Sequence, residues 1–446
     1  MRQSTRARMA VAMVAAGMLA LTACGGDEKD TDKNNGGNGG GASGGTETTL
    51  IFWHYEGEDA AMTKSWNAAI EEFEANNPGV KIKVEGQTFE QLQKNAKIVL
   101  TGNDVPDIME YNKGNGTAGQ LASQGLLTDL SAYASQYGWD SKLSPSLQTT
   151  ARYDENGLMG SGNWYGVPTY GEYVTLFFNQ DMFEANGVAV PTSFAELESA
   201  MEAFVAKGII PLAESGAEYA LGQLWYELVL SKGDRSFIDS YQLFQGDADF
   251  TAGPLLEGSE LLAEWVEKGF IAKDCTGLTA EDMGTAFIAG TYPMMFSGSW
   301  WFGRLNTEVQ FTLGQVPFPG SSFSPGSSGN LLVIPSNAKN ADLAAKFIDT
   351  ALGEKAQNVM AELGGLPVAG DSSVITDANT KVLQENWDSI VAADGLAYYP
   401  DWPVAGFYDQ IVAFGQSIVN GSKTPAAALA ELGDFYNAGK ADLLGG

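Results

Sequence analysis

Short apolar stretches alternate with amphipathic stretches over residues 48–112, and this alternation constrains the fold more than any other feature. Thr49–Tyr55 is an apolar run that predicts a buried strand. Met62, Trp66, Ile70 and Phe73 then recur at the spacing of one helix face, with acidic residues off that face. A strand followed directly by an amphipathic helix is the first half of a layered α/β unit.

The same alternation continues to residue 112. Val80, Ile82 and Val84 alternate with lysines, which predicts a half-exposed strand. A second helix over Phe89–Leu100 and a third strand over Asp107–Asn112 follow. Strand, helix, strand, helix and strand in this order predict an α/β fold with a mainly parallel sheet.

The N-terminus has the layout of a secretory signal. Residues 1–8 contain three arginines and no acid, and Met9–Leu21 is apolar but shorter than the roughly 20 residues of a spanning helix. The run ends in Leu21–Cys24, with the sequence LTAC, which resembles the lipobox of bacterial lipoproteins. The resemblance implies a signal peptide over residues 1–23 and diacylglycerol on Cys24.

A polar, glycine-rich stretch follows the cysteine. Gly25–Gly45 contains no large apolar side chain and so cannot bury enough surface to offset its chain entropy. We therefore expect residues 24–47 to form a flexible tether. Together with lipid on Cys24, it predicts a protein anchored to the outer face of the cell membrane.

Charge and composition argue against several classes of function. The formal net charge of −30 disfavours binding of nucleic acid or anionic lipid through a basic patch. His54 is the sole histidine, so the sequence offers one residue for a histidine metal site or a Ser–His relay, and both are disfavoured. We expect no metal and no cofactor; His54 either packs in the core or touches ligand. Cys275 is predicted to be a small packing residue, with a reactive thiol as the alternative.

A glycine motif follows the third predicted strand. Gly114, Gly116 and Gly119 match G-x-G-x-x-G, but no acidic residue stands at the expected ribose position and this is not the first strand. We interpret the motif as a flexible turn at the rim of a cleft.

Five sequence blocks occur in the order of a known family. They are LIFWHYEGEDA…FEANNPGVKIKVEGQTFEQL…LTGNDVPDIMEY, YGVPTYGEYVTLFFNQDMFEANGVAVPTSFAEL, FIAGTYPMMFSGSWW, GNLLVIPSNAKNADLAAKFIDTAL and AELGGLPV. From Thr48 to the C-terminus the chain resembles the family 1 extracellular solute-binding proteins, the sugar-binding subunits of ABC importers.

The resemblance implies a two-lobe fold of the periplasmic-binding-protein type (type II), with a ligand cleft between the lobes and three crossings at a hinge. We expect the crossings near Tyr170–Glu172, Leu313–Phe318 and Leu366–Ser373. The corresponding parts are lobe 1 over 48–170, lobe 2 over 171–317, lobe 1 again over 318–368, and a helical part of lobe 2 over 369–446.

The resemblance also implies ligand-binding residues, many of them aromatic or acidic. Aromatic rings cover the C–H faces of a pyranose, while carboxylates and amides bond its hydroxyls. The implied ligand contacts are Tyr55, Glu56, Tyr111, Asn112, Glu172, Gln223, Trp225, Trp300, Gly364, Gly365, Asp401, Trp402 and Tyr408. Phe178 stands where many members have tyrosine, and the loop WHYEGED differs from that of the maltodextrin protein, so the particular sugar stays open.

The predicted function is capture of a mono- or oligosaccharide and its delivery to the permease of an ABC importer, by a monomer without enzymatic activity. One alternative is a binder of another small solute, such as a polyol or polyamine. A remote alternative is a secreted glycan-active enzyme. Glu56, Glu58, Glu172 and Asp401 would supply its two carboxylates, which such chemistry needs about 5 to 10 Å apart.

Overall fold

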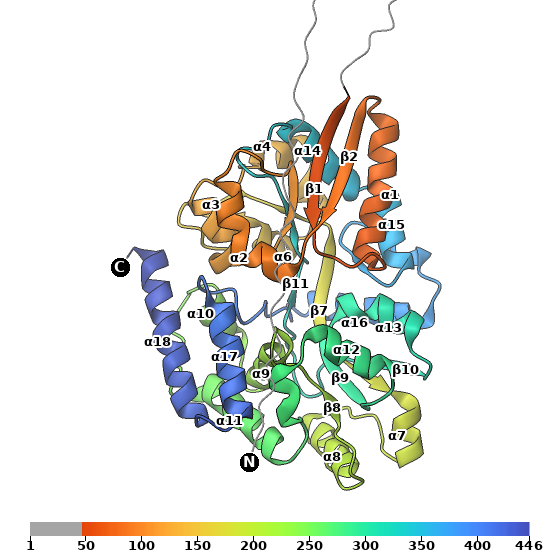
Figure 1. Ribbon diagram of the computed structural model, residues 1–446, viewed down its shortest axis with the longest axis vertical. Helices are drawn as coiled ribbons and strands as arrows, with labels where there is room; N and C mark the ends of the chain where they lie inside the picture. The colour runs from red at the N-terminus through yellow and green to blue at the C-terminus, as the bar shows by residue number, and fades with distance from the viewer. Residues whose placement is uncertain (1–46, 446) are drawn as a thin grey trace, which may run out of the picture. The chain divides into compact units, whose positions relative to one another are not determined.

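The computed structural model describes residues 47–445, and in this range two large β-sheets lie one above the other, joined by a long strand (Figure 1), while a third sheet has only two strands. The predicted signal peptide, Cys24 and the tether up to residue 46 lie outside the described residues. The five-stranded sheet has the order β2 (Val80–Gly86), β1 (Thr48–His54), β3 (Ile108–Tyr111), β12 (Leu331–Val333) and β6 (Val167–Pro168). The six-stranded sheet has the order β10 (Leu313–Val316), β7 (Tyr170–Asn179), β9 (Met294–Gly298) and β8 (Leu212–Ala213), while β11 (Gly326–Ser327) and β13 (Leu366–Pro367) also pair with β7.

The first lobe is built on the five-stranded sheet. Its helices and remaining strands are α1 (Ala61–Asn76), α2 (Phe89–Leu100), η1 (Asn115–Gly119), α3 (Gln120–Ser123), α4 (Ser131–Tyr137), α5 (Trp139–Lys142), α6 (Pro145–Gln148), η2 (Thr149–Ala151), β4 (Arg152–Tyr153), β5 (Asn163–Trp164), α14 (Ala341–Ala351) and α15 (Glu354–Glu362). Helix α1 packs against α14 and α15, which come from much later in the chain.

The second lobe is built on the six-stranded sheet. Its helices are α7 (Gln180–Asn186), α8 (Phe194–Val205), α9 (Ala220–Leu230), α10 (Arg235–Gln242), α11 (Gly253–Glu267), η3 (Lys273–Gly277), α12 (Ala280–Ile288), η4 (Ser299–Trp301), α13 (Phe302–Glu308), α16 (Ala378–Ala392), α17 (Phe407–Val419) and α18 (Pro425–Leu444). The short η5 (Ser372–Val374) packs against α15 of the first lobe. Helices α9, α11, α17 and α18 pack together as one layer.

Strand β7 is buried along its whole length because the second sheet is covered on both faces. Successive side chains of a strand point to opposite faces. Leu176 and Phe178 accordingly enter the hydrophobic cluster under α9 and α11, whereas Tyr173 and Phe177 enter a separate cluster with Trp301. Burial of apolar surface on both faces holds this strand rigidly between its neighbours.

The elements predicted for residues 48–112 are confirmed. The first strand, the first helix, the half-exposed strand and the helix over Phe89–Leu100 correspond to β1, α1, β2 and α2. In α1, Met62, Trp66 and Phe73 are buried, as their spacing predicts. In β1 burial alternates, with Leu50 and Phe52 inside, so this strand is covered mainly on one face.

The predicted parallel pairing is confirmed for β1, β2 and β3, but the prediction of a mainly parallel sheet is wrong, because both large sheets are mixed. Strand β1 is parallel to β2 and β3, and β8 is parallel to β9, whereas β12 is antiparallel to β3 and β7 is antiparallel to β9 and β10. Strands β1 and β3 run toward the second lobe, while β12 enters from that side without a crossover helix. It therefore runs the opposite way.

The two-lobe fold with three connections beside a hinge follows the predicted architecture. The first residues of β7 pair with β13 at Gly171 and Tyr170 and with β11 at Tyr173 and Glu172. The predicted crossing near Leu313–Phe318 coincides with β10, which pairs with the far end of β7 inside the second sheet. The segment that runs beside the start of β7 is β11.

Within residues 47–445 no helix combines the length and the apolar composition that crossing a membrane requires.

Candidate ligand-binding site

A cavity of about 200 Å³ lies where residues of both lobes meet. Its lining residues are Tyr55, Glu56, Phe89, Asn112, Glu172, Tyr219, Gln223, Trp300, Asn330, Tyr399, Asp401, Trp402 and Tyr408. We call this cavity the first compartment. The structure places in it nine of the predicted site residues: Tyr55, Glu56, Asn112, Glu172, Gln223, Trp300, Asp401, Trp402 and Tyr408.

Strand ends bring the first-lobe residues to the compartment. Tyr55 and Glu56 follow β1, and Asn112 follows β3. Because β1 and β3 are parallel neighbours, their carboxyl ends meet at the same edge of the sheet. Glu172 lies in the part of β7 that pairs with β11, and it is only 5 % exposed.

Four predicted site residues lie outside the first compartment. Trp225 is fully buried under α11, and its Nε1 donates to Ser259 Oγ at 2.9 Å. It lies two residues after Gln223 on α9 and therefore points to the opposite side of the helix. Tyr111 lines a neighbouring cavity, while Gly364 and Gly365 line a narrow crevice beside Trp300.

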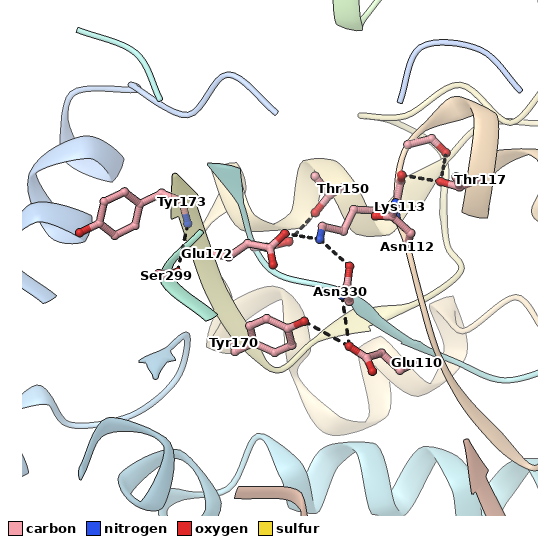
Figure 2. Close-up of polar contacts among 12 residues, drawn as sticks. Glu110, Asn112, Lys113, Thr117, Thr150, Tyr170, Glu172, Tyr173, Ser299 and Asn330 are labelled. Carbon is pink, nitrogen blue, oxygen red and sulfur yellow. Dashed lines mark hydrogen bonds and ion pairs between the residues drawn. The ribbon is translucent and has the colours of Figure 1, made fainter. Parts of the chain in front are cut away.

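A buried lysine, Lys113, organises the polar wall of the compartment (Figure 2). Its Nζ lies 2.5 Å from Glu172 Oε1 and 2.8 Å from Asn330 Oδ1, and its side chain is about 1 % exposed. The same Nζ lies 5.1 Å from the ring centroid of Trp402 and 5.7 Å from that of Tyr399. Lys113 therefore joins the end of β3 to the hinge strand and to two cavity aromatics. Burial lowers its pKa, and the neighbouring Glu172 opposes that effect.

A second carboxylate, Glu110, continues this network. It accepts hydrogen bonds from Asn330 Nδ2 at 3.1 Å and from Tyr170 Oη at 3.2 Å (Figure 2). It also accepts one from the backbone N–H of Tyr55 at 3.1 Å. Burial raises the pKa of Glu110 to about 7 despite these donors.

Two further acids of the compartment are also shifted toward their neutral forms. Burial, and then the charge of Glu110, raises the pKa of Glu56 well above its ordinary value. Burial raises the pKa of Asp401 to about 6, although Lys113 partly opposes the shift. A protonated carboxyl group can donate a hydrogen bond as well as accept one. This wall can therefore accept hydrogen bonds from the hydroxyl groups of a ligand and donate hydrogen bonds to them.

Adjacent tryptophans of η4 divide between the cavity and the core. Trp300 lines the compartment, whereas Trp301 packs in the cluster under the second sheet. Both indole N–H groups point to Tyr219 Oη at 3.3 Å. The pair lies in a 3₁₀ turn, so the division follows from the turn geometry and not from strand alternation.

The lobes are also joined by direct contacts between residues that line the compartment or adjoin it. Tyr408 Oη of α17 donates to Glu90 Oε1 of α2 at 2.8 Å. The Phe89 ring contacts both Tyr55 and Tyr408 edge-on, with centroids 5.3 and 6.0 Å apart. These contacts connect an element of each lobe.

The glycine motif serves close packing of backbone segments. A Cβ on Gly116 would lie 2.4 Å from the backbone of Val404, and one on Gly119 would lie 2.1 Å from Gly157 O. The Gly116 N–H donates to Trp402 O at 2.9 Å, and Gly114 has a positive φ of 106°. The glycines thus let η1 approach the segment that carries Trp402.

His54 and Cys275 lie in hydrophobic surroundings away from the compartment. His54 packs between Phe52 and Trp66 with centroid distances of 5.3 and 5.2 Å, and burial lowers its pKa. Cys275 is a buried free thiol whose pKa burial raises. Across residues 47–445, no three His, Cys, Asp or Glu side chains are grouped as metal ligands.

The sequence did not predict four cavity residues: Phe89, Tyr219, Asn330 and Tyr399. Tyr219 precedes Gln223 by four residues and so shares its helix face, which is a detectable signal. Asn330 directly precedes β12, so it resembles Asn112 in lying at a strand end. Lys113 and Glu110 gave no signal, because charged residues in an acidic chain are usually solvated.

These features define a two-lobed binding protein with its ligand site at the hinge. A family model described as bacterial extracellular solute-binding protein matches residues 59–358, so the chain belongs to this family, as its sequence predicts. It is 26 % identical over 415 residues to the diacetylchitobiose-binding protein DasA of Streptomyces coelicolor, with 89 % of this chain and 86 % of the relative covered.

Solved structures share the fold. A chitin oligosaccharide binding protein matches with a TM-score of 0.76 at 20 % identity, covering 89 % of this chain and 100 % of its own. The GacH receptor of Streptomyces glaucescens, solved unliganded and with acarbose, matches with a TM-score of 0.70 at 24 % identity, covering 89 % and 98 %. The predicted two-lobe fold is confirmed by these matches.

Proposed function

We propose that this protein binds a carbohydrate in the first compartment and delivers it to the permease of an ABC importer. The family is one of solute-binding proteins, and relatives of this chain include a diacetylchitobiose-binding protein and a multiple sugar-binding protein of Streptococcus mutans. The chain acts by binding and release, without altering its ligand.

The observation that carries this proposal is the division of the compartment into aromatic and polar walls. The rings of Trp300, Tyr399 and Trp402 contribute the apolar surface. Asn112, Glu56, Asp401 and Glu172 contribute hydrogen-bonding groups, and Lys113 is paired with Glu172. Pyranoses present C–H faces and hydroxyl edges, so both kinds of wall have a partner on a sugar.

Three polar atoms of the lining residues lack partners among the described residues. They are the hydroxyls of Tyr55 and Tyr399 and Oε1 of Gln223. A buried polar group without a partner costs about 1–3 kcal/mol. Hydroxyl groups of a bound sugar, or waters that they hold in place, would remove this cost.

The alternative solutes fit this compartment less well. A polyamine would be favoured by unpaired carboxylates, but Glu172 is paired with Lys113 and the pKa values of Glu56 and Asp401 are raised. A polyol lacks the flat C–H face that would pack on Trp300. A glycan-active enzyme needs a carboxyl group that donates a proton, and the raised pKa values of Glu56 and Asp401 would suit that role. The family, however, is one of solute-binding proteins, and the relatives described above are named as binding proteins. Glu58, another acid considered for catalysis, is exposed and outside the lining.

We also propose that the protein is a lipid-anchored monomer on the outer face of the cell membrane. The N-terminal sequence supports a signal peptide over residues 1–23, lipid on Cys24 and a tether over 24–47. The parts expected from the sequence are 48–170 and 318–368 for the first lobe, with 171–317 and 369–446 for the second. We propose moving the second boundary from 318 to β11 (Gly326–Ser327), because Phe318 packs in the core of the second lobe.

Titration calorimetry of the purified protein against neutral mono- and oligosaccharides, polyols and polyamines tests the proposed ligand class. Trp300→Ala is expected to lower sugar affinity at least tenfold, because it removes an aromatic wall of the compartment. Trp53→Ala is the matched control, since Trp53 is a half-buried tryptophan of β1 outside the lining. Binding of a polyamine and of no sugar would overturn the proposed carbohydrate ligand.

A further inference from the structure

A second cavity adjoins the first compartment. It also has a volume of about 200 Å³, and it shares Phe89, Asp401 and Tyr408 with the first. We call it the second compartment. One ordered water needs about 10–15 Å³ of cavity volume. A compartment of about 200 Å³ is many times larger and has room for a group the size of one sugar ring.

Phe89, Asp401 and Tyr408 line both compartments and so mark the boundary between them. The Tyr408 hydroxyl is bonded across the lobes to Glu90, which itself lines the second compartment. Because Tyr408 lines both cavities, its ring can contact ligand in each of them.

The second compartment has walls from both lobes. Gln93 comes from α2, Thr117 and Gln120 come from η1 and α3, and Asp409 comes from α17. An occupant would therefore contact elements that hinge motion moves relative to one another, and it would favour the closed arrangement.

The polar atoms of this wall suit hydroxyl groups. The side-chain Nε2 of Gln93 is buried and has no hydrogen-bond partner. Gln120 also lines the wall, and no side-chain hydrogen bond of it is found within the described residues. Tyr111 and Phe407 supply apolar surface beside these amides. The wall thus repeats the combination of rings and amides found in the first compartment.

We propose that the second compartment is a subsite for a further sugar unit, so that the preferred ligand is an oligosaccharide with one unit on each side of Tyr408. This inference rests on the proposed carbohydrate function and specifies its chain length. A single monosaccharide would fill one compartment and leave the Gln93 amide unpaired.

Calorimetry with the purified full chain tests the subsite. The probes are one-, two- and three-unit members of the N-acetylglucosamine, glucose and xylose series. In the series that binds, the two-unit sugar is expected to bind at least tenfold more tightly than the one-unit sugar. Gln93→Ala and Gln120→Ala should each weaken two-unit binding about three- to tenfold and change one-unit binding less than twofold.

Gln91→Ala is the matched control, because Gln91 is an exposed glutamine of the same helix outside both linings. It should leave both affinities at the wild-type value. Equal affinity for one- and two-unit sugars, or unchanged two-unit binding in both cavity variants, would overturn the subsite while the carbohydrate function stands. If no carbohydrate binds the wild-type chain, the proposed function itself fails.

Discussion

Lys113 is the residue on which most of the buried polar wall depends. It is the cation that pairs with Glu172, and it also bonds Asn330, which in turn bonds Glu110. Removing one partner of a buried ion pair leaves the other charge without compensation, and that cost exceeds the net worth of the pair itself.

Lys113→Met is therefore expected to lower the free energy of unfolding by about 3–5 kcal/mol. Adding Glu172→Gln should restore part of the loss, because the unpaired charge is then gone. Urea unfolding followed by fluorescence measures both values. Lys142→Met is the control: its Nζ lies 2.5 Å from Asp349 but the pair is partly exposed, so a loss of at most about 1 kcal/mol is expected. Similar losses for Lys113→Met and Lys142→Met would contradict the special role of the buried pair.

Glu214 is expected to make the stability of the second lobe depend on pH. It is buried beside β8, one of its oxygens has no partner, and burial raises its pKa from 4.5 to about 8. The folded state therefore retains a proton that the unfolded state releases between these pH values. Stability falls as pH rises through that window.

Glu214→Gln should remove this contribution, since an amide does not ionise. Its unfolding free energy relative to the wild type is expected to be higher at pH 8 than at pH 5, measured by urea unfolding at each pH. Glu257→Gln, on the exposed face of α11, should show the same difference at both pH values. An identical pH profile for wild type and Glu214→Gln would show that Glu214 does not titrate in this window.

At the scale of elements, the sequence predicted the helices and strands whose pattern is local. The spacing in α1 and the alternation in β2 depend only on which face is buried, so they can be found without knowing the neighbours. The direction of β12 and the place of β11 depend on how the chain returns from the other lobe. No local pattern encodes that return.

The same distinction explains the site predictions. Trp300 and Glu172 follow or lie in strands whose ends reach the hinge, so a family resemblance locates them. The same resemblance predicted Trp225 as a ligand contact. Trp225 follows Gln223 by two residues on α9, so its side chain points to the opposite side of the helix and is buried in the core. Lys113 becomes a site residue only when β7 and β12 arrive beside it.

The packing of η1 against the segment after Asp401 gives a prediction for these two elements. Gly116→Ala places a methyl group 2.4 Å from the Val404 backbone, so one segment must move. We expect a loss of about 1–3 kcal/mol in unfolding free energy and weaker ligand binding, because Trp402 moves with the segment. Urea unfolding and calorimetry measure these effects. Gly86→Ala at the end of β2 has no atom within 4 Å and should change neither; wild-type behaviour of Gly116→Ala would contradict the tight approach.

At the scale of the whole molecule, binding and anchoring are assigned to separate parts of the chain. The compartments lie within residues 47–445, whereas the proposed lipid site is Cys24. Cys24→Ala is expected to leave the protein unprocessed or released from the membrane, as fractionation of cells would detect. Ligand affinity of the purified variant should equal that of the wild type, and retention on membranes at the wild-type level would refute the anchor.

The sheet of the first lobe has a consequence for the order of folding. Its strand β3 ends at Tyr111, but its neighbour β12 begins only at Leu331, after the first part of the second lobe, from β7 to β11, has been made. Pairings between distant segments form slowly and expose strand edges in the meantime. During synthesis one edge of β3 therefore stays unpaired until β12 has been made. A ribosome-bound chain ending before Leu331 would lack the strand that completes this lobe, and chaperones that hold extended segments would have β3 as a binding site.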